Sequence, residues 1–160
     1  MELQIITNPN PILRKKAKSV RRITPEIKKL VKDMAETLYK APGVGLAANQ
    51  VAKLLRIVVI DISEDRDSLI VLINPKYTYK SKEKKVLAEG CLSVPGYEGQ
   101  VERHVTVRIK TMNVEGELEA NGYLAQAIQH EMDHLDGILY IDCLYGDTGL
   151  RRLDPKTPVE

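Results

Sequence analysis

His130-Glu131-Met132-Asp133-His134 forms the pattern H-E-x-x-H. Residues four apart lie on one face of a helix, so the imidazoles of His130 and His134 can close on a single metal ion. Glu131 follows the first ligand and can act as general base toward a water molecule activated by that ion. The pattern therefore predicts a metallohydrolase, and it leaves open which bond is cut.

Two helices are expected from end signals and apolar spacing. The metal-carrying helix should begin near Asn121 and end at Leu135, where Asp136-Gly137 closes it. Thr24-Pro25-Glu26 supplies an N-cap hydroxyl, a proline at the first helical position and an acid in the first turn. Apolar residues follow at helical spacing as far as Leu38, which predicts an N-terminal helix with one face on the core.

Strands are expected from short aliphatic and alternating runs. Residues 56–61 and 69–74 are aliphatic and rich in β-branched side chains, and residues 77–85 alternate aromatic with charged side chains. Residues 101–110 alternate as one continuous strand whose apolar face is interrupted only by Arg103. The expected fold is α+β: mostly antiparallel β-sheets packed around a central metal-binding helix, with an N-terminal helix.

Composition predicts one globular domain in a reducing compartment. The chain has 160 residues, of which 43% are hydrophobic, and we expect a catalytic domain over residues 1–145 and an extended or frayed tail over 146–160. The net charge of +2 gives no reason to expect direct nucleic-acid or membrane binding. No secretory signal or membrane-length apolar run is visible, and there are only two cysteines, so we expect a cytoplasmic protein.

The third metal ligand decides the class, because catalytic sites of this kind usually hold three protein ligands and a water. A downstream Glu would indicate a thermolysin-type protease, and a His six residues after His134 would indicate a metzincin. That position is Tyr140, and a phenol is a poor substitute. Cys91 is the better candidate, against the alternative of a small buried hydrophobe. Cys143 is expected in the core and His104 in solvent.

The Gly-rich segment at residues 43–50 also fits the dinucleotide fingerprint G-x-G-x-x-A, but a helix and a proline precede it where a strand is required. An extended glycine segment instead offers free backbone groups for strand-like pairing with a peptide. Gln50 closes the segment with an amide that can donate to an oxyanion. Taken alone, the segment is better explained as a loop that ends the preceding helix, with an incidental Gln50.

Together three segments resemble the peptide deformylase family. That family carries G-x-G-x-A-A-x-Q, E-G-C-L-S and H-E-x-D-H in this order, and the chain matches them at residues 43–50, 89–93 and 130–134. The resemblance extends from Asn8-Pro9 to about Asp142. It implies removal of the formyl group from the N-terminal formyl-methionine of new polypeptides, with release of formate.

The resemblance also implies roles for individual residues. Cys91, His130 and His134 would hold the metal, Glu131 would act as base and then acid, and Gln50 with the backbone N–H of Leu92 would receive the formyl oxygen. The substrate backbone and methionine side chain would meet positions Gly43, Val44, Gly45, Leu87, Tyr123, Gln126 and Ala127, of which Gln126 is unusually polar for an apolar pocket.

The ligand set leaves the metal open, since one thiolate and two imidazoles suit Fe²⁺, Zn²⁺, Ni²⁺ and Co²⁺. The resemblance implies Fe²⁺ in vivo, with oxygen sensitivity of both the ion and Cys91. It implies formyl-methionyl peptides and nascent chains as partners. Docking on the ribosome stays open, because residues 149–155 look too short and too proline-limited for the C-terminal helix that many relatives carry. The alternatives are an H-E-x-x-H endoprotease and a non-enzymatic protein that keeps a metal for stability.

Overall fold

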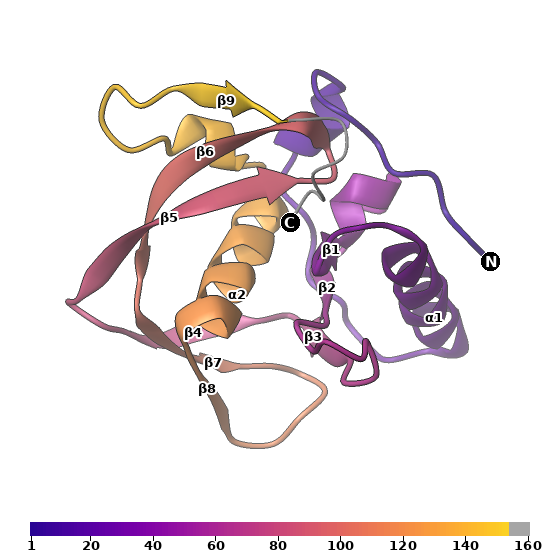
Figure 1. Cartoon of the computed structure of the whole chain (residues 1–160). Coiled ribbons are helices and arrows are strands. Elements are labelled where there is room, and N and C mark those ends of the chain that lie inside the picture. The colour runs from indigo at the N-terminus through magenta and orange to yellow at the C-terminus, as the bar shows by residue number, and fades with distance from the viewer. Residues whose placement is uncertain (154–160) are drawn as a thin grey trace.

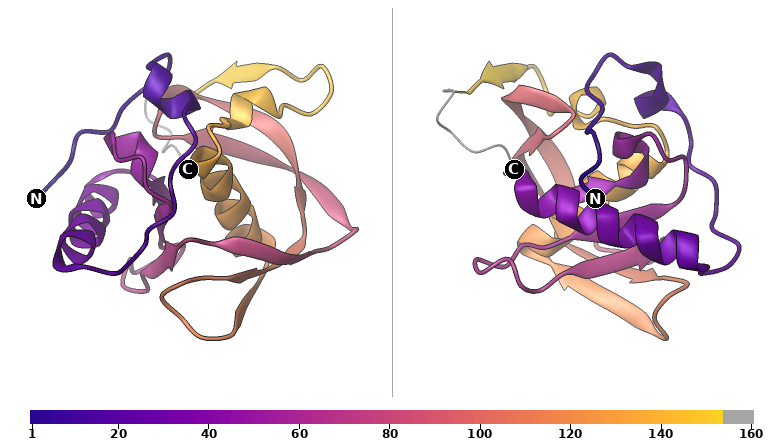
Figure 2. Two further views of the ribbon diagram at one scale, coloured as in Figure 1. Left: turned by 180° about the vertical axis from the view of Figure 1, so that it is seen from behind. Right: turned by 90° about the vertical axis from the view of Figure 1, so that its right-hand side faces the viewer.

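The computed structural model describes residues 1–153, and three antiparallel sheets of three strands each surround helix α2 (Figure 1). Helix α1 lies outside the first sheet, as the two further views show (Figure 2). The α+β fold predicted from the sequence is therefore confirmed. The elements are η1 Pro11–Arg14, α1 Pro25–Lys40, β1 Gly45–Ala47, η2 Ala48–Val51, β2 Ile57–Ile60, β3 Ile70–Ile73, β4 Lys76–Lys80, β5 Lys84–Cys91, β6 Val94–His104, β7 Thr106–Lys110, β8 Glu117–Asn121, α2 Gly122–Leu135, η3 Tyr140–Asp142 and β9 Leu150–Arg152.

Both helices begin and end at the expected signals. The Thr24 side chain accepts a hydrogen bond from the backbone N–H of Ile27, which satisfies one of the free donors at the start of α1. Helix α2 starts after Asn121, and Gly137 adopts a φ of +74° just beyond its last turn. Among residues 1–153, neither helix combines the length and the apolar character that crossing a membrane requires.

Strand β2 packs toward α2 on one face and toward α1 on the other. All four of its residues are buried, and alternate side chains point to opposite faces of a strand. Val58 and Ile60 pack in the cluster that includes the α2 residues, whereas Ile57 and Val59 pack in the cluster of α1. The sheet β1-β2-β3 is therefore sandwiched between the two helices, and this fixes β1 near α2.

The prediction of a single strand over residues 101–110 is wrong, because the strand is interrupted at Val105. Strand β6 ends at His104 and pairs with β5, while β7 begins at Thr106 and pairs with β4 and β8. The backbone N–H of Val105 instead donates to Glu83 O. The alternating pattern continues through the break, so it could not reveal that the two halves belong to different sheets.

Part of the predicted tail is a strand. Residues 150–152 form β9, which pairs with β6 through Tyr97↔Arg152 and Gly99↔Leu150. Residues 150–152 of the expected extended or frayed tail are thus extended and paired with β6, and residues 154–160 lie outside the described part of the chain. The domain boundary at residue 145 stays a prediction.

Candidate metal centre and active site

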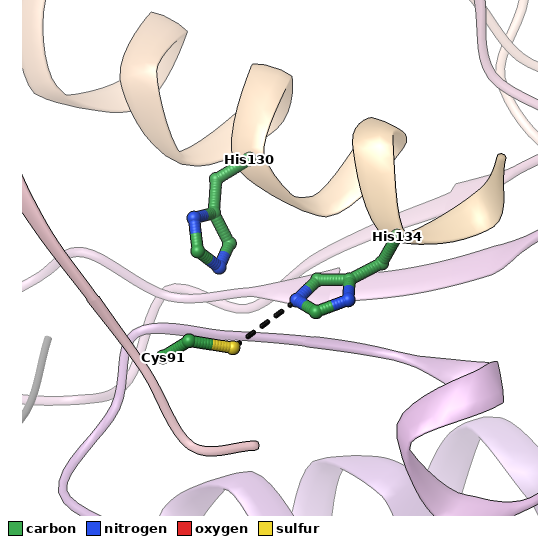
Figure 3. Close-up of side chains that lie close together, drawn as sticks. All are labelled: Cys91, His130 and His134. Atoms are coloured by element: carbon green, nitrogen blue, oxygen red, sulfur yellow. Dashed lines mark hydrogen bonds between the residues drawn. The ribbon is translucent and has the colours of Figure 1, made fainter. Parts of the chain in front are cut away.

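Helix α2 presents two imidazoles on its inner face. His130 and His134 lie one turn apart, and their ring centroids are 5.0 Å apart (Figure 3). His134 is fully buried, and burial lowers its pKa well below the ordinary value, so the ring is held neutral. A neutral imidazole is the form that binds a metal.

Cys91 reaches this face from the end of β5. Its Sγ lies 3.2 Å from Nε2 of His134, and its side chain is 2% exposed (Figure 3). The ligand atoms of Cys91, His130 and His134 all lie within 4.8 Å of one another. One thiolate and two imidazoles at this spacing match the donor set and size of a mononuclear transition-metal site.

Glu89 orients the first imidazole of the cluster. It lies two residues before Cys91, across a register shift in the pairing of β5 with β6, and each of the two side chains contacts one of the α2 histidines. Its Oε1 lies 2.9 Å from Nδ1 of His130, which leaves Nε2 of that ring for an ion. Such a carboxylate partner is typical of metal-binding histidines. The residues present therefore fit a divalent metal.

Arg103 keeps the Glu89 carboxylate ionised. Its Nε and one Nη donate to the two oxygens of Glu89 at 2.7 and 2.8 Å, and its other Nη donates to Asp133 at 2.7 Å. Burial alone would raise the pKa of Glu89, but the hydrogen bonds from Arg103 and His130 outweigh it and lower that pKa to about 2. The helix and the sheet are thus joined by one buried ionic network.

Glu131 lies beside the cluster as a buried acid. It is 2% exposed, its Oε1 is 3.9 Å from Nε2 of His134, and its Oε2 has no hydrogen-bond partner among the described residues. Desolvation raises the pKa of Glu131 to about 7. A carboxyl group tuned near neutrality can both accept and return a proton, as general acid–base catalysis requires.

Strand β1 closes the site from the opposite side. It pairs with β2 through Gly45↔Ile60 and is the edge strand of its sheet. A Cβ at Gly45 would meet the Glu131 side chain at 2.9 Å, so glycine is needed for this close approach. An edge strand beside a metal cluster can pair with an extended peptide.

Gln50 extends its amide toward Cys91 from the short helix η2. Its Oε1 accepts a hydrogen bond from the Ala47 N–H at 2.9 Å, which fixes the orientation of the side chain. The Nε2 group donates to Ser93 Oγ at 3.0 Å and lies 3.7 Å from Cys91 Sγ. Gln50 therefore offers an oriented donor at the edge of the cluster.

A pocket opens beside the cluster. It is lined by residues of β1, η2, β5 and α2, together with Val44 just before β1 and Leu92 in the turn after β5. Of the residues predicted from the resemblance, it brings together Val44, Gly45, Gln50, Cys91, Leu92, Tyr123, Gln126, Ala127, His130 and Glu131. Gly43 lies against the Leu92 side chain, and Leu87 lines a neighbouring cavity instead.

Three other positions weighed from the sequence lie outside the cluster. Cys143 is exposed, so its expected place in the core is wrong; the neighbouring Leu139 and Tyr140 are buried while the short helix η3 turns Cys143 outward. Tyr140 is buried, and its ring centroid lies 6.0 Å from that of His130. His104 is half-buried, and its Nδ1 lies 2.6 Å from Ser81 O rather than pointing freely into solvent.

The supporting network was missed from the sequence. In the sequence, Glu89 stands out only as part of a motif, and nothing adjacent to Asp133 or Arg103 indicates their role. A signal did exist, because a lone arginine on an otherwise apolar strand face must be paired if it is buried. Arg103 is 7% exposed and has two carboxylate partners.

A Cys-His-His cluster with a buried glutamate on an H-E-x-x-H helix defines a metal-binding hydrolase. The family model described as "Polypeptide deformylase" matches residues 2–148. The chain belongs to this family.

Named relatives agree with the family match. The chain is 49% identical to a peptide deformylase of Acinetobacter baumannii (strain SDF) over 89% of this chain and 82% of the relative. It is 50% identical to peptide deformylase 1 of Ralstonia nicotianae over 89% of this chain and 86% of that one. A solved peptide deformylase from Legionella pneumophila superposes with a TM-score of 0.86 at 39% identity, covering 91% of this chain and 87% of that one.

Proposed function

We propose that this protein is a metal-dependent hydrolase that removes the N-formyl group from the N-terminal formyl-methionine of newly synthesised polypeptides. The single observation that carries the proposal is the convergence of Cys91, His130 and His134 beside the buried Glu131. The close relatives are peptide deformylases along most of their length, which supports the same activity here.

The three metal ligands and the residues around them have distinct roles. A divalent ion held by Cys91, His130 and His134 would polarise the formyl oxygen and lower the pKa of a water molecule. Glu89 holds His130 in the orientation and tautomer that a ligand needs.

Groups of the protein then transfer one proton and stabilise one developing negative charge. Glu131 takes a proton from the attacking water, whose oxygen bonds to the formyl carbon. Gln50 Nε2 and the Leu92 N–H donate to the oxyanion that develops there. Glu131 returns the proton to the amine nitrogen as the C–N bond breaks, so the products are formate and a free N-terminus.

The test is formate release from a formyl-Met tripeptide by protein purified without oxygen and loaded with Fe²⁺ or Ni²⁺. We expect turnover by the unchanged protein and a loss of at least about a hundredfold in Glu131→Gln, which keeps the side-chain shape but removes the base. Formate release no higher than that of Glu131→Gln would refute the proposal. Cleavage of an N-acetylated peptide would support the endoprotease instead.

We further propose Fe²⁺ as the ion in vivo, with Zn²⁺, Ni²⁺ and Co²⁺ as functional replacements. The thiolate and imidazole donors support this range. A ferrous ion and its thiolate ligand are both open to oxidation, so the Fe²⁺ form should lose activity in air faster than the Ni²⁺ form. Equal inactivation rates of the two forms would contradict the assignment.

We propose nascent chains in the cytoplasm as the substrates, with the ribosome as the place of action. A free thiol ligand at Cys91 supports a reducing compartment. Co-sedimentation of the full chain with translating ribosomes tests the association. Recovery of all the protein in the supernatant at low salt would contradict it.

A further inference from the structure

The segment between η1 and α1 concentrates positive charge. Residues 14–22 hold six of the 24 Lys and Arg residues of the chain and none of its 22 Asp and Glu residues. The remainder, with 18 basic and 22 acidic residues, therefore has a net charge of −4, although the whole chain has +2. The total charge, which by itself gives no reason to expect nucleic-acid binding, hides this segregation. We call residues 14–22 the basic strap.

The backbone of the basic strap is fixed to the core. The Ala17 N–H donates to Leu135 O, at the end of α2, at 2.8 Å. The side chain of Asn74 accepts a hydrogen bond from the Val20 N–H and donates one to Val20 O, both at 2.8 Å. Ala17 and Val20 are each only 5% exposed. The strap therefore runs as an ordered segment along the outside of the molecule, from η1 to the start of α1 (Figure 2, left).

The cations of the basic strap face solvent, and most of them have no anionic partner. All six are exposed. Arg14 is paired with Asp142, but within residues 1–153 no ion pair is formed by the other five. Those five are Lys15, Lys16, Lys18, Arg21 and Arg22. Asp136, which borders the strap, is already paired with Arg56 at 3.0 Å. The strap thus presents five uncompensated positive charges on an ordered backbone.

A merely solvated surface usually intersperses charges of both signs, because like charges repel one another. A linear polyanion would relieve this repulsion along the whole strap. Residues 15–22 span at most about 25 Å, and a nucleic-acid strand at about 3.4 Å per nucleotide presents roughly seven phosphates over that length. Insertion into a membrane is disfavoured, since the apolar residues of the strap, Ala17 and Val20, face the core.

We propose that the basic strap binds the phosphate backbone of RNA without reading its sequence. The inference goes beyond the proposed catalytic activity, because it involves no residue of the metal centre. Only the choice of RNA over DNA rests on the proposed function, since newly synthesised polypeptides emerge from an RNA-containing particle. Contacts to phosphates fix a strand in place and carry no base specificity.

Binding at the strap should leave the pocket open. The strap meets α2 at Leu135, the last residue of the helix. Tyr123, which is 39% exposed and lines the pocket, lies twelve residues earlier in the same helix. At 1.5 Å per residue this corresponds to about 18 Å along the helix. We therefore expect bound RNA and a formylated peptide to occupy the protein together.

The expected size of the effect follows from counterion release. Each cation that neutralises a phosphate of a single strand contributes about −0.7 to the slope of log K against log salt concentration. Five cations predict a slope of about −3.5. The affinity should then fall roughly 100-fold between 50 and 200 mM salt.

The experiment measures binding of a fluorescently labelled 20-nucleotide oligouridine to the metal-loaded full chain by anisotropy. The strap variant replaces all five unpaired cations by glutamine. The matched control replaces the five lysines of residues 76–85 by glutamine, so both variants change the net charge from +2 to −3. The replaced lysines of the control are Lys76, Lys80, Lys82, Lys84 and Lys85.

We expect a slope of about −3.5 for the unchanged protein, and a slope near zero with at least about 100-fold weaker binding at 50 mM salt for the strap variant. The control should keep most of the slope, because its lysines lie beside carboxylates such as Glu102, 3.9 Å from Lys84. Circular dichroism and formate release from a formyl-Met tripeptide should be unchanged in both. If the strap variant does not fold, the double variant Lys15→Gln/Lys16→Gln carries the test, with an expected slope of about −2.

Four results would overturn the inference: no binding of the oligouridine at 50 mM salt; equal losses in the strap variant and the control; equally tight binding of polyglutamate or of phosphatidylglycerol vesicles; or competition between the oligouridine and the formylated tripeptide, which would place the RNA in the pocket. A clear preference for the 20-nucleotide oligothymidine would overturn the choice of RNA. Absence of formate release by the unchanged protein is a separate outcome, which would refute the proposed function and leave phosphate binding by the strap standing.

Discussion

Gly45→Ala should impair catalysis without unfolding the protein, because the added methyl group would contact the proposed base. A Cβ at this position lies 2.9 Å from both Cγ and Cδ of Glu131 and 3.0 Å from Oε2. Gly45 pairs with Ile60 as an ordinary strand residue and does not have a positive φ, so alanine suits its backbone. The perturbation therefore falls on the Glu131 carboxylate rather than on the local fold.

The expected decrease in kcat follows from the steric overlap between the added Cβ and the Glu131 side chain. Ordinary van der Waals contact begins at 3.4 Å, so the carboxylate must retreat by about 0.5 Å. A misplacement of about 1 Å in an active site costs on the order of a hundredfold in rate, so half that distance predicts roughly a tenfold decrease in kcat. Metal content should stay unchanged, because the three ligands are not touched.

The assay is steady-state formate release with kcat and KM determined separately. A displaced base lowers kcat, whereas simple obstruction of the substrate raises KM and leaves kcat unchanged. Glu131→Asp shortens the carboxylate side chain and makes room for the methyl group, so Gly45→Ala should cost little in that background. The reasoning is wrong if Gly45→Ala keeps its full kcat, or if its effect is the same in both backgrounds.

Four further substitutions separate metal binding from folding. Cys91→Ser should greatly reduce bound metal, whereas Cys143→Ser should not, because only the first thiol lies in the cluster; equal metal content by elemental analysis would show that the third ligand is misassigned. Glu89→Gln removes the charged partner of a ligand and should weaken metal affinity by about 10- to 100-fold, measured by competition with a chelator; unchanged affinity would exclude the positioning role. Gly137→Ala should cost at least about 2 kcal/mol in the free energy of unfolding measured in urea, since the residue has φ +74° and its Cβ would overlap the Arg14 carbonyl; a smaller loss would mean that the backbone can shift there.

The helices were predictable because their signals are local. The Thr24 cap and the Gly137 end are written in adjacent residues, and the histidine spacing follows from helix geometry alone. Cys91 could be favoured as a ligand from residue chemistry, but its approach to α2 depends on the pairing of β5 with β6. The order of the motifs therefore pointed to the ligand residues, whereas the positions of these residues relative to one another depend on the fold.

The incorrect predictions concern places where one local sequence pattern is compatible with two tertiary arrangements. Alternation continues unbroken across Val105, yet the strands on either side join different sheets. Cys143 lies in an apolar run, yet it is exposed because a run of this length does not specify which side faces the core. Leu87 matches a pocket position by resemblance, and in the structure it lines a neighbouring hollow rather than the pocket beside the cluster.

An independent physical signal leads to the same site without any motif. Within residues 1–153, four buried side-chain atoms have no hydrogen-bond partner: Asn49 Oδ1, Glu131 Oε2, His134 Nδ1 and Tyr140 OH. Asn49 donates to the carbonyl of His134, and the Tyr140 ring lies 6.0 Å from that of His130, so all four belong to or border the cluster. Buried unsatisfied groups destabilise a fold and are retained mainly where function needs them. Their concentration around one metal cluster means that this fold is destabilised at the place where the proposed chemistry occurs.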